Sequence, residues 1–319
     1  MRSMLVAVFV LSVTAFAQKS DNPHAFDYDA KLPFDSQDVG VDFRGDVSIY
    51  DFSYASPKGG RVPAYLVLPP GKGPFAAIIW GHWCWQNSEF RNRKEFLEEA
   101  VALAPAGAAS LLIDFPQARP GYVADKDPLS AQQVEDLVQR VVDIRRGADL
   151  LLSRPFVDAK RVAYVGHSCG ASAGGIVSGL DKRFRAFVLM AGSLSDEVEI
   201  KSPEFQEFRQ KTGPEKVDAF VAKYAWADAG RYISHAAPAV LFLQYATQEK
   251  FLTPERAKAA AALASEPKQF KLYDAPHALN AEARRDRIAF LTEQLGLKPL
   301  PAEVIAAIPA LPQPPEPQP

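Results

Sequence analysis

The chain has 319 residues, of which 48% are hydrophobic and 23% charged, as in an ordinary globular protein with one large domain or two small ones. Its 36 basic residues nearly balance its 38 acidic ones and form no basic stripe, so we do not expect the protein to bind nucleic acid. Two cysteines, Cys84 and Cys169, are too few for a disulfide scaffold and can form one bridge or none.

The first residues have the pattern of a secretory signal peptide at residues 1–17. Arg2 supplies the short charged region, residues 5–16 are apolar, and the triplet Ala-Phe-Ala ends at Ala17. We therefore expect export to the periplasm or the extracellular space after cleavage near Ala17; the alternative is a retained anchor helix. No later segment is apolar and long enough to cross a membrane, so stable membrane insertion is not expected.

After an irregular N-terminal segment at residues 18–45, strand-like segments recur along residues 46–299. The first two are joined by a Pro-Lys-Gly-Gly turn and are expected to be antiparallel. The third is a continuous apolar run, as in a strand that is buried on both faces. The expected strands lie at residues 47–55, 61–69, 75–81, 108–115, 161–166, 184–192, 239–246 and 269–275.

Helices are expected between the later strands. The clearest spans residues 130–153, where Ser130 begins a capping box and apolar residues recur on one face. Thr253, followed by a proline, caps another helix, and Asn280 and Gly296 bound the last one. Strands that alternate with helices predict a mostly parallel sheet with helices on both faces.

Two segments depart from this alternation. Residues 193–236 are polar and are expected to form a small helical lid insertion above the carboxyl edge of the sheet. Its aromatic residues Tyr224, Trp226 and Tyr232 either stack on a substrate or simply pack. Residues 300–319 contain seven prolines, which favours an extended or disordered tail.

The residues Gly-His-Ser-Cys-Gly at 166–170 lie between a strand and a helix rich in small residues. In this G-x-S-x-G pattern the serine occupies a sharp turn that exposes its hydroxyl above the sheet. The flanking glycines allow the backbone to cross closely, because they lack a Cβ. We therefore interpret Ser168 as a nucleophile; the alternative is a tight turn without chemistry.

A serine nucleophile needs a base, and the candidates are His24, His82, His167, His235 and His277. His277 follows the last strand and precedes the last helix, so its loop is expected at the carboxyl edge beside the serine. The side chain of His167 is expected to point away from the serine, and His235 is expected on the surface or the lid. A packing role is the alternative for His277.

The acid that orients the base is expected between the serine and the histidine in the chain. Glu249 lies in the loop that follows strand 239–246 and is our first candidate. Asp274 precedes His277 by three residues, and Asp196 follows strand 184–192, so both remain alternative acids. The alternative for Glu249 is an exposed loop carboxylate.

An oxyanion hole requires two N–H groups. One is expected from Cys169, directly after the nucleophile, and the other from His82 or Trp83 in the loop after strand 75–81. Trp83 and Trp85 are either pocket-lining aromatics or ordinary packing groups. Cys169 is interpreted as a small packing residue, since Ser168 holds the apex of the turn.

These features resemble the α/β-hydrolase superfamily, over about residues 45–297. The stretches "RPFVDAKRVAYVGHSCGA" and "LYDAPHALN" resemble its dienelactone hydrolase and prolyl-oligopeptidase-like branch. The resemblance implies the α/β-hydrolase fold with a sheet of eight strands, no cofactor, and hydrolysis of esters or related acyl compounds. Two departures are Glu249, where the family usually has aspartate, and Ser168, where dienelactone hydrolases have cysteine. We therefore do not carry over the dienelactone substrate.

The sequence predicts an exported serine hydrolase, a carboxylesterase that acts on a small-molecule ester or acylated substrate. A serine peptidase or amidase of the same fold and a non-catalytic binding protein are the alternatives. The sequence contains no H-E-x-x-H motif and no paired-cysteine spacing, so no metal site is expected. The acyl group, the alcohol and the oligomeric state are not specified by these residues.

Overall fold

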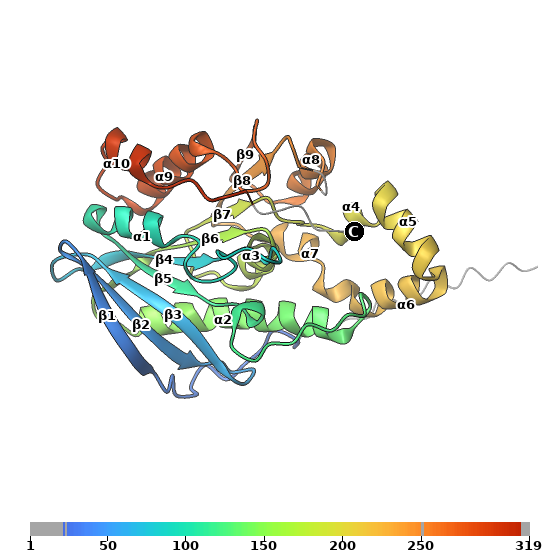
Figure 1. Ribbon diagram of the computed structural model, residues 1–319, viewed down its shortest axis with the longest axis horizontal. Helices are drawn as coiled ribbons and strands as arrows, with labels where there is room; N and C mark the ends of the chain where they lie inside the picture. The colour runs from blue at the N-terminus through green and yellow to red at the C-terminus, as the bar shows by residue number, and fades with distance from the viewer. Residues whose placement is uncertain (1–21, 23, 250–251, 314–319) are drawn as a thin grey trace, which may run out of the picture.

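The computed structural model describes residues 22, 24–249 and 252–313 and contains one nine-stranded sheet flanked by helices (Figure 1). The predicted signal peptide lies outside the described residues. The strand order is β1-β2-β3-β5-β4-β6-β7-β8-β9. The first three strands are antiparallel to their neighbours, and all pairs from β5 to β9 are parallel. The predicted mostly parallel sheet is therefore confirmed.

The strands lie close to their predicted positions, with one addition. Their bounds are β1 (Gln37–Arg44), β2 (Val47–Ala55), β3 (Arg61–Leu68), β4 (Phe75–Gly81), β5 (Ala108–Ile113), β6 (Val157–His167), β7 (Ala186–Met190), β8 (Val240–Ala246) and β9 (Lys268–Tyr273). Strand β1 corrects the expected eight strands to nine and lies in the segment predicted to be irregular. All its residues are exposed, so its sequence carries no signal of a buried face.

Helices cover both faces of the sheet. Their bounds are α1 (Leu97–Leu103), α2 (Ala131–Leu152), α3 (Cys169–Leu180), α4 (Asp196–Glu199), α5 (Pro203–Thr212), α6 (Pro214–Tyr224), α7 (Gly230–Ile233), α8 (Pro254–Leu263), α9 (Ala281–Leu295) and α10 (Ala302–Ala307), with short 3₁₀ turns at Ala104–Ala106, Pro116–Ala118 and Ala225–Ala227. Helices α2, α3, α7 and α8 contribute to one apolar cluster, and α1 and α9 to the other.

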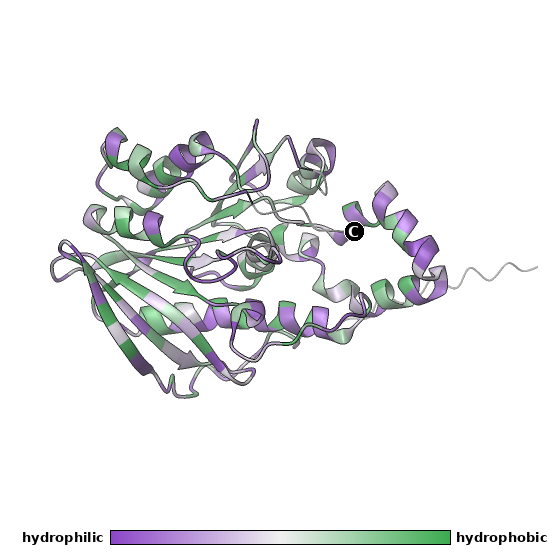
Figure 2. Cartoon of the chain, viewed as in Figure 1, coloured by the Kyte–Doolittle hydropathy of each residue, from purple (hydrophilic) through white to green (hydrophobic). Residues whose placement is uncertain are grey.

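Strand β4 shows why the sheet is buried on both sides. Ala77 and Ile79 pack in the cluster with α2 and α3, whereas Ile78 and Trp80 pack in the cluster with α1 and α9. Successive side chains of a strand point to opposite faces, so a continuous apolar run supplies both cores. Figure 2 shows the corresponding hydrophobic colouring on the central strands and mixed colouring on the surrounding helices.

The insertion between β7 and β8 is helical, as predicted. It forms α4 to α7, and α5 and α6 extend beyond the end of the sheet at which α3 begins (Figure 1). Of the lid aromatics, Trp226 is buried and Tyr232 donates to its carbonyl oxygen (2.8 Å), so both pack. No helix among the described residues has the length and hydrophobicity to cross a membrane.

Residues 300–313 of the predicted tail contain a helix, which corrects the expectation of an extended or disordered segment, and residues 314–319 lie outside the described residues. Helix α10 occupies part of residues 300–319, and Ile308, which follows it, is buried. Arg284 of α9 donates a hydrogen bond to the carbonyl oxygen of Ile308. This contact could not be predicted from composition, because it depends on which surface the tail meets.

Candidate active site

Ser168 lies in a strained turn between β6 and α3. Its φ and ψ are 55° and −117°, a combination that a non-glycine residue rarely adopts. A Cβ on Gly166 would lie 2.5 Å from the carbonyl oxygen of Gly170, and a Cβ on Gly170 would lie 2.5 Å from that of Gly81. The two glycines of the motif therefore allow the backbone at residues 81, 166 and 170 to pass at close range.

Helix α3 begins directly after the serine. Ser168 makes no side-chain cap hydrogen bond, and the positive end of the helix dipole favours negative charge at this position. Tyr164 of β6 donates to the carbonyl oxygen of Gly170 (2.8 Å), which fixes the start of the helix against the strand. The N–H of Cys169 thus belongs to a rigid segment beside Ser168.

His277 and Glu249 meet at the same edge of the sheet. Nδ1 of His277 donates to Oε2 of Glu249, and both side chains are largely buried. This bond leaves Nε2 of His277 with the lone pair, and Nε2 has no hydrogen-bond partner among the described residues. Burial lowers the pKa of His277 from 6.5, while the hydrogen bond to Glu249 opposes that shift.

The position of His277 relative to the nucleophile turn is fixed through His167, the residue before Ser168. Nε2 of His167 lies 2.9 Å from the carbonyl oxygen of His277, and the two ring centroids are 5.0 Å apart. Ser168, Glu249 and His277 lie in the loops that follow β6, β8 and β9, and these loops meet at the carboxyl edge of the sheet.

The alternative acids lie elsewhere. Asp274 accepts hydrogen bonds from the side chains of Thr247 (3.2 Å) and Gln248 (3.0 Å) at the exposed edge of the site. Asp196 is the exposed first residue of α4, and its backbone N–H donates to Oδ1 of Asp228 (2.9 Å). Neither carboxylate is bonded to His277 in the structure, whereas Glu249 is.

The loop after β4 contains the two residues considered for the second oxyanion donor. The Trp83 N–H donates to Oε2 of Glu95 (2.6 Å), so it is not available to an oxyanion, and His82 is the remaining candidate. Nε2 of His82 accepts from the Phe115 N–H (2.9 Å), and Nδ1 therefore donates to the Trp83 carbonyl oxygen (2.6 Å). Burial lowers the pKa of His82 to about 3, which agrees with a neutral ring.

The two tryptophans of this loop differ in environment. Trp83 is completely buried and packs against both His167 (5.0 Å between ring centroids) and His277 (6.2 Å), so it is a packing group. Trp85 is half-buried, and its ring centroid lies 4.9 Å from that of His277. Of the two tryptophans, Trp85 is therefore the one that is partly exposed to solvent beside His277.

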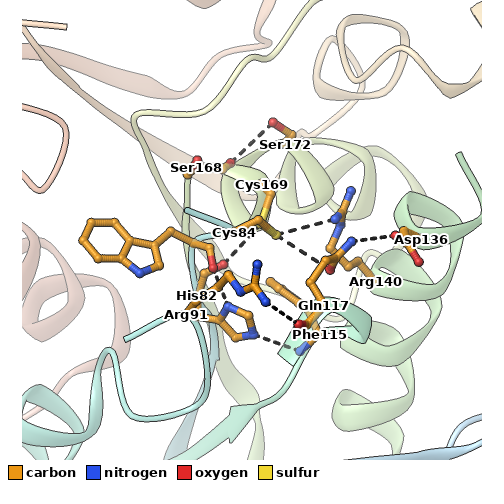
Figure 3. The surroundings of a disulfide bond; sticks show 12 residues. His82, Cys84, Arg91, Phe115, Gln117, Asp136, Arg140, Ser168, Cys169 and Ser172 are labelled. Carbon is orange, nitrogen blue, oxygen red and sulfur yellow. Dashed lines mark hydrogen bonds between the residues drawn. A yellow bond between two sulfur atoms is a disulfide. The ribbon is translucent and has the colours of Figure 1, made fainter. Parts of the chain in front are cut away.

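Cys84 and Cys169 form a disulfide bond with a Cα–Cα distance of 5.7 Å. The bridge joins the loop after β4 to the first residue of α3, and Arg140 of α2 donates to Sγ of Cys84 (3.6 Å) (Figure 3). We expected Cys169 to be a small packing residue, and the structure shows that it also links the two segments covalently. Because its sulfur is bonded, Cys169 offers no thiol nucleophile beside Ser168.

Sequence reasoning missed Glu95, which bonds to both Trp83 and His167. Glu95 precedes a helix in a segment with several charged residues, so nothing in the neighbouring sequence indicates that its side chain is buried. Of the other histidines, His24 and His235 are exposed. Within the described ranges, no cluster of three or more histidine, cysteine, aspartate or glutamate side chains is placed to hold a metal ion.

No protein-family model and no curated protein sequence matches this chain. Several solved structures do match its fold. An acetyl xylan esterase from Paenibacillus sp. R4 has 22% identity and a TM-score of 0.66, over 83% of this chain and 90% of that chain. Acetyl xylan esterase 1 from Thermoanaerobacterium sp. JW/SL YS485 has 17% identity and a TM-score of 0.65, over 85% and 91%.

A third similar structure is a glucuronoyl esterase from Solibacter usitatus, with 14% identity and a TM-score of 0.56, over 82% of this chain and 86% of that chain. At identities this low, the likeness concerns the course of the backbone. The sheet order, the strained serine turn and these superpositions agree with one another. The chain has the α/β-hydrolase fold.

Proposed function

We propose that the protein is a carboxylic ester hydrolase that acts through an acyl-enzyme on Ser168. The observation that carries this proposal is the hydrogen bond between Glu249 and His277 beside the serine turn. It sets the tautomer of His277 whose Nε2 can accept a proton from a serine hydroxyl. The esterase names of the similar structures support an ester as the substrate.

In the proposed reaction, Oγ of Ser168 attacks the acyl carbon while Nε2 of His277 takes the hydroxyl proton. The N–H groups of Cys169 and His82 stabilise the oxyanion. His277 then gives the proton to the leaving alcohol, and an acyl-serine remains. A water molecule, deprotonated by His277, attacks this ester, and collapse of the second intermediate releases the acid and restores Ser168.

We propose that the substrate is a small-molecule ester, and that its non-reacting part meets Trp85. The Trp85 ring is half-buried at the edge of the site, and its centroid lies 4.9 Å from that of His277. Hydrolysis rates for acetylated xylose and for p-nitrophenyl acetate, compared between the parent chain and Trp85→Ala, test this contact. We expect the variant to raise KM, and an unchanged KM for both substrates would contradict the assignment.

We also propose that the chain is exported. The leader pattern at residues 1–17 and the Cys84–Cys169 bridge support this, since disulfides persist in oxidising compartments. Expression of the full chain followed by mass measurement of the secreted protein tests it. A mature chain that begins near Gln18 is expected, and an uncleaved chain retained in the cytoplasm would rule it out.

The test of the activity combines labelling with a substrate panel. A fluorophosphonate is expected to label Ser168, and p-nitrophenyl esters of increasing acyl length are expected to be hydrolysed faster than a peptide anilide. Ser168→Ala is expected to lower kcat by a factor on the order of 10⁴ or more with the fold intact. Labelling at another residue, or full activity of Ser168→Ala, would refute the nucleophile. Preferred cleavage of the anilide would indicate a peptidase or amidase instead.

A further inference from the structure

Glu95 and His167 form a second histidine–carboxylate pair, behind the one that contains His277. The Glu95 side chain is inaccessible to solvent, and its Oε1 lies 2.6 Å from Nδ1 of His167. Its Oε2 accepts the Trp83 N–H at 2.6 Å. Neither residue has a role in the reaction proposed above. The pair is therefore a buried polar cluster whose presence requires an explanation, because an unneeded buried carboxyl destabilises a fold.

The hydrogen bonds determine how many protons the Glu95–His167 pair carries. The carbonyl oxygen of His277 can only accept, so Nε2 of His167 must carry a proton and donate to it. One further proton then lies between Nδ1 of His167 and Oε1 of Glu95. Whether it is closer to nitrogen or to oxygen, the pair as a whole has no net charge. Oε2 of Glu95 accepts from the Trp83 N–H in either case.

Burial selects between these two arrangements. It raises the pKa of the Glu95 carboxyl well above its usual range and lowers the pKa of the His167 imidazole. Both shifts favour a carboxylic acid that donates to a neutral ring. A neutral His167 stacks on His277 at 5.0 Å between ring centroids without repelling the imidazolium that forms there during catalysis.

The cluster joins the two loops on which the proposed reaction depends. Glu95 bonds to the backbone of the loop at 82–85, which carries the second oxyanion donor. His167 bonds to the backbone of the loop at 275–280, which carries the base. His167 is itself the residue before Ser168. One buried pair is thus bonded or covalently joined to all three segments of the site.

We propose that Glu95 and His167 are positioning residues that hold the oxyanion loop and the histidine loop in register with Ser168. Their role is the pattern of hydrogen bonds and not a charge. The catalytic part of this inference rests on the proposed esterase function, whereas the holding of the loops does not. Displacement of a reacting group by about 1 Å can cost roughly 10²-fold in rate, so such a tie has a measurable kinetic consequence.

Substitutions of Glu95 separate hydrogen bonding from charge. Glu95→Gln keeps both bonds, because its amide NH₂ donates to Nδ1 of His167 and its carbonyl accepts from the Trp83 N–H. Glu95→Ala loses both. We expect Glu95→Ala to lower kcat per fluorophosphonate-labelled site by about 10- to 100-fold with a smaller change in KM, and Glu95→Gln to restore most of kcat. Glu95→Asp, which is one methylene shorter, replaces the alanine variant if that variant does not fold.

Hydrogen exchange followed by mass spectrometry gives a readout that does not depend on activity. Glu95→Ala should increase exchange in segments 82–85 and 275–280, because the Trp83 amide loses its acceptor and His167 loses its partner. Glu95→Gln should leave both segments protected. A matched control is Glu99→Ala, which removes another buried glutamate, bonded to Arg287 of α9. This control should lower the melting temperature and leave kcat per labelled site unchanged.

The outcomes discriminate between the two proposals. Unchanged exchange and kcat in Glu95→Ala would overturn the positioning role, and so would equal losses in Glu95→Gln and Glu95→Ala, which would show that charge is required. Increased exchange in Glu95→Ala without any loss of kcat would show that the pair holds the loops but would overturn its positioning role in the reaction. If the parent chain hydrolyses no ester and Ser168 remains unlabelled, the esterase function fails, and the exchange comparison still decides whether the pair holds the loops.

Discussion

His277 is placed between two opposing influences on its protonation. Burial disfavours the imidazolium and lowers the pKa, and the hydrogen bond to Glu249 favours the imidazolium and raises it. The net shift is downward from 6.5. A base with a lowered pKa is unprotonated over a wider range of pH, and the carboxylate limits the loss of basicity that burial would otherwise cause.

The first prediction concerns pH dependence. The neutral form of His277 is the active one, so activity is present above its pKa and is lost as the pH falls through it. We expect the acid limb of kcat/KM to have its midpoint below 6.5. Glu249→Gln removes the charge that raises this pKa, so the midpoint should move lower still while kcat falls by a factor on the order of 10² to 10⁴. Initial rates across the pH range measure both effects.

The matched control for this experiment is Asp274→Asn, because Asp274 lies at the same edge of the site. The Asp274 carboxylate bonds to Thr247 and Gln248 and not to His277, so we expect less than about a threefold change in kcat. A severe loss in Asp274→Asn, together with a nearly silent Glu249→Gln, would show that Asp274 is the acid in solution. The same comparison with Asp196→Asn excludes the third carboxylate.

Among the elements, the loop after β4 is held from two sides. The disulfide attaches Cys84 to the first residue of α3, and Glu95 attaches the Trp83 N–H to the segment before α1. The proposed oxyanion donors, Cys169 and His82, lie on the two segments that the bridge connects. A covalent tie of this kind limits how far the two N–H groups can separate, which is what preorganised stabilisation of an oxyanion requires.

The second prediction is that loss of the bridge lowers both stability and rate. Its half-cystines are 85 residues apart, and a chain-entropy treatment gives a stabilisation of roughly 4–5 kcal/mol for a loop of that length. Replacement of both Cys84 and Cys169 by serine should lower the free energy of unfolding by up to this amount in urea titrations. Dithiothreitol should have no effect on the double variant, which serves as the control. A parent chain that keeps its kcat and stability after complete reduction would show that the tie is dispensable.

The elements show which features can be read from sequence. Strand β4 and the G-x-S-x-G turn at 166–170 were predictable, because a continuous apolar run and a glycine-flanked serine are patterns within a few consecutive residues. Strand β1 was not, since an edge strand with all residues exposed has no buried face to mark it. Glu95 was missed for a different reason. Its partner His167 is 72 residues away, and contacts between distant segments leave no periodic signal.

On the scale of the whole molecule, the segment before β1 connects the body of the domain to the lid insertion. Phe26 is buried against Trp226 and Tyr232, with ring centroids 5.7 Å and 5.6 Å away. Arg145 of α2 donates to the Phe26 carbonyl oxygen (2.7 Å). A segment that we expected to be irregular therefore packs on two elements that are far apart in the chain, although it contains little regular structure before β1.

The third prediction follows from this packing. Phe26→Ala removes a buried ring from the cluster that also contains α2 and the lid residue Trp226, and a phenylalanine-to-alanine change in a core costs about 3–5 kcal/mol. We expect that loss in the free energy of unfolding, together with faster proteolysis within the insertion, because the ring that joins the insertion to the N-terminal segment is gone.

The control for this prediction is Val39→Ala. Val39 is 74% exposed on β1, and its truncation should change the free energy of unfolding by less than about 0.5 kcal/mol. Urea titration and limited trypsin digestion of both variants measure the two effects. Equal stability of Phe26→Ala and Val39→Ala would contradict the contact between the N-terminal segment and the insertion in solution.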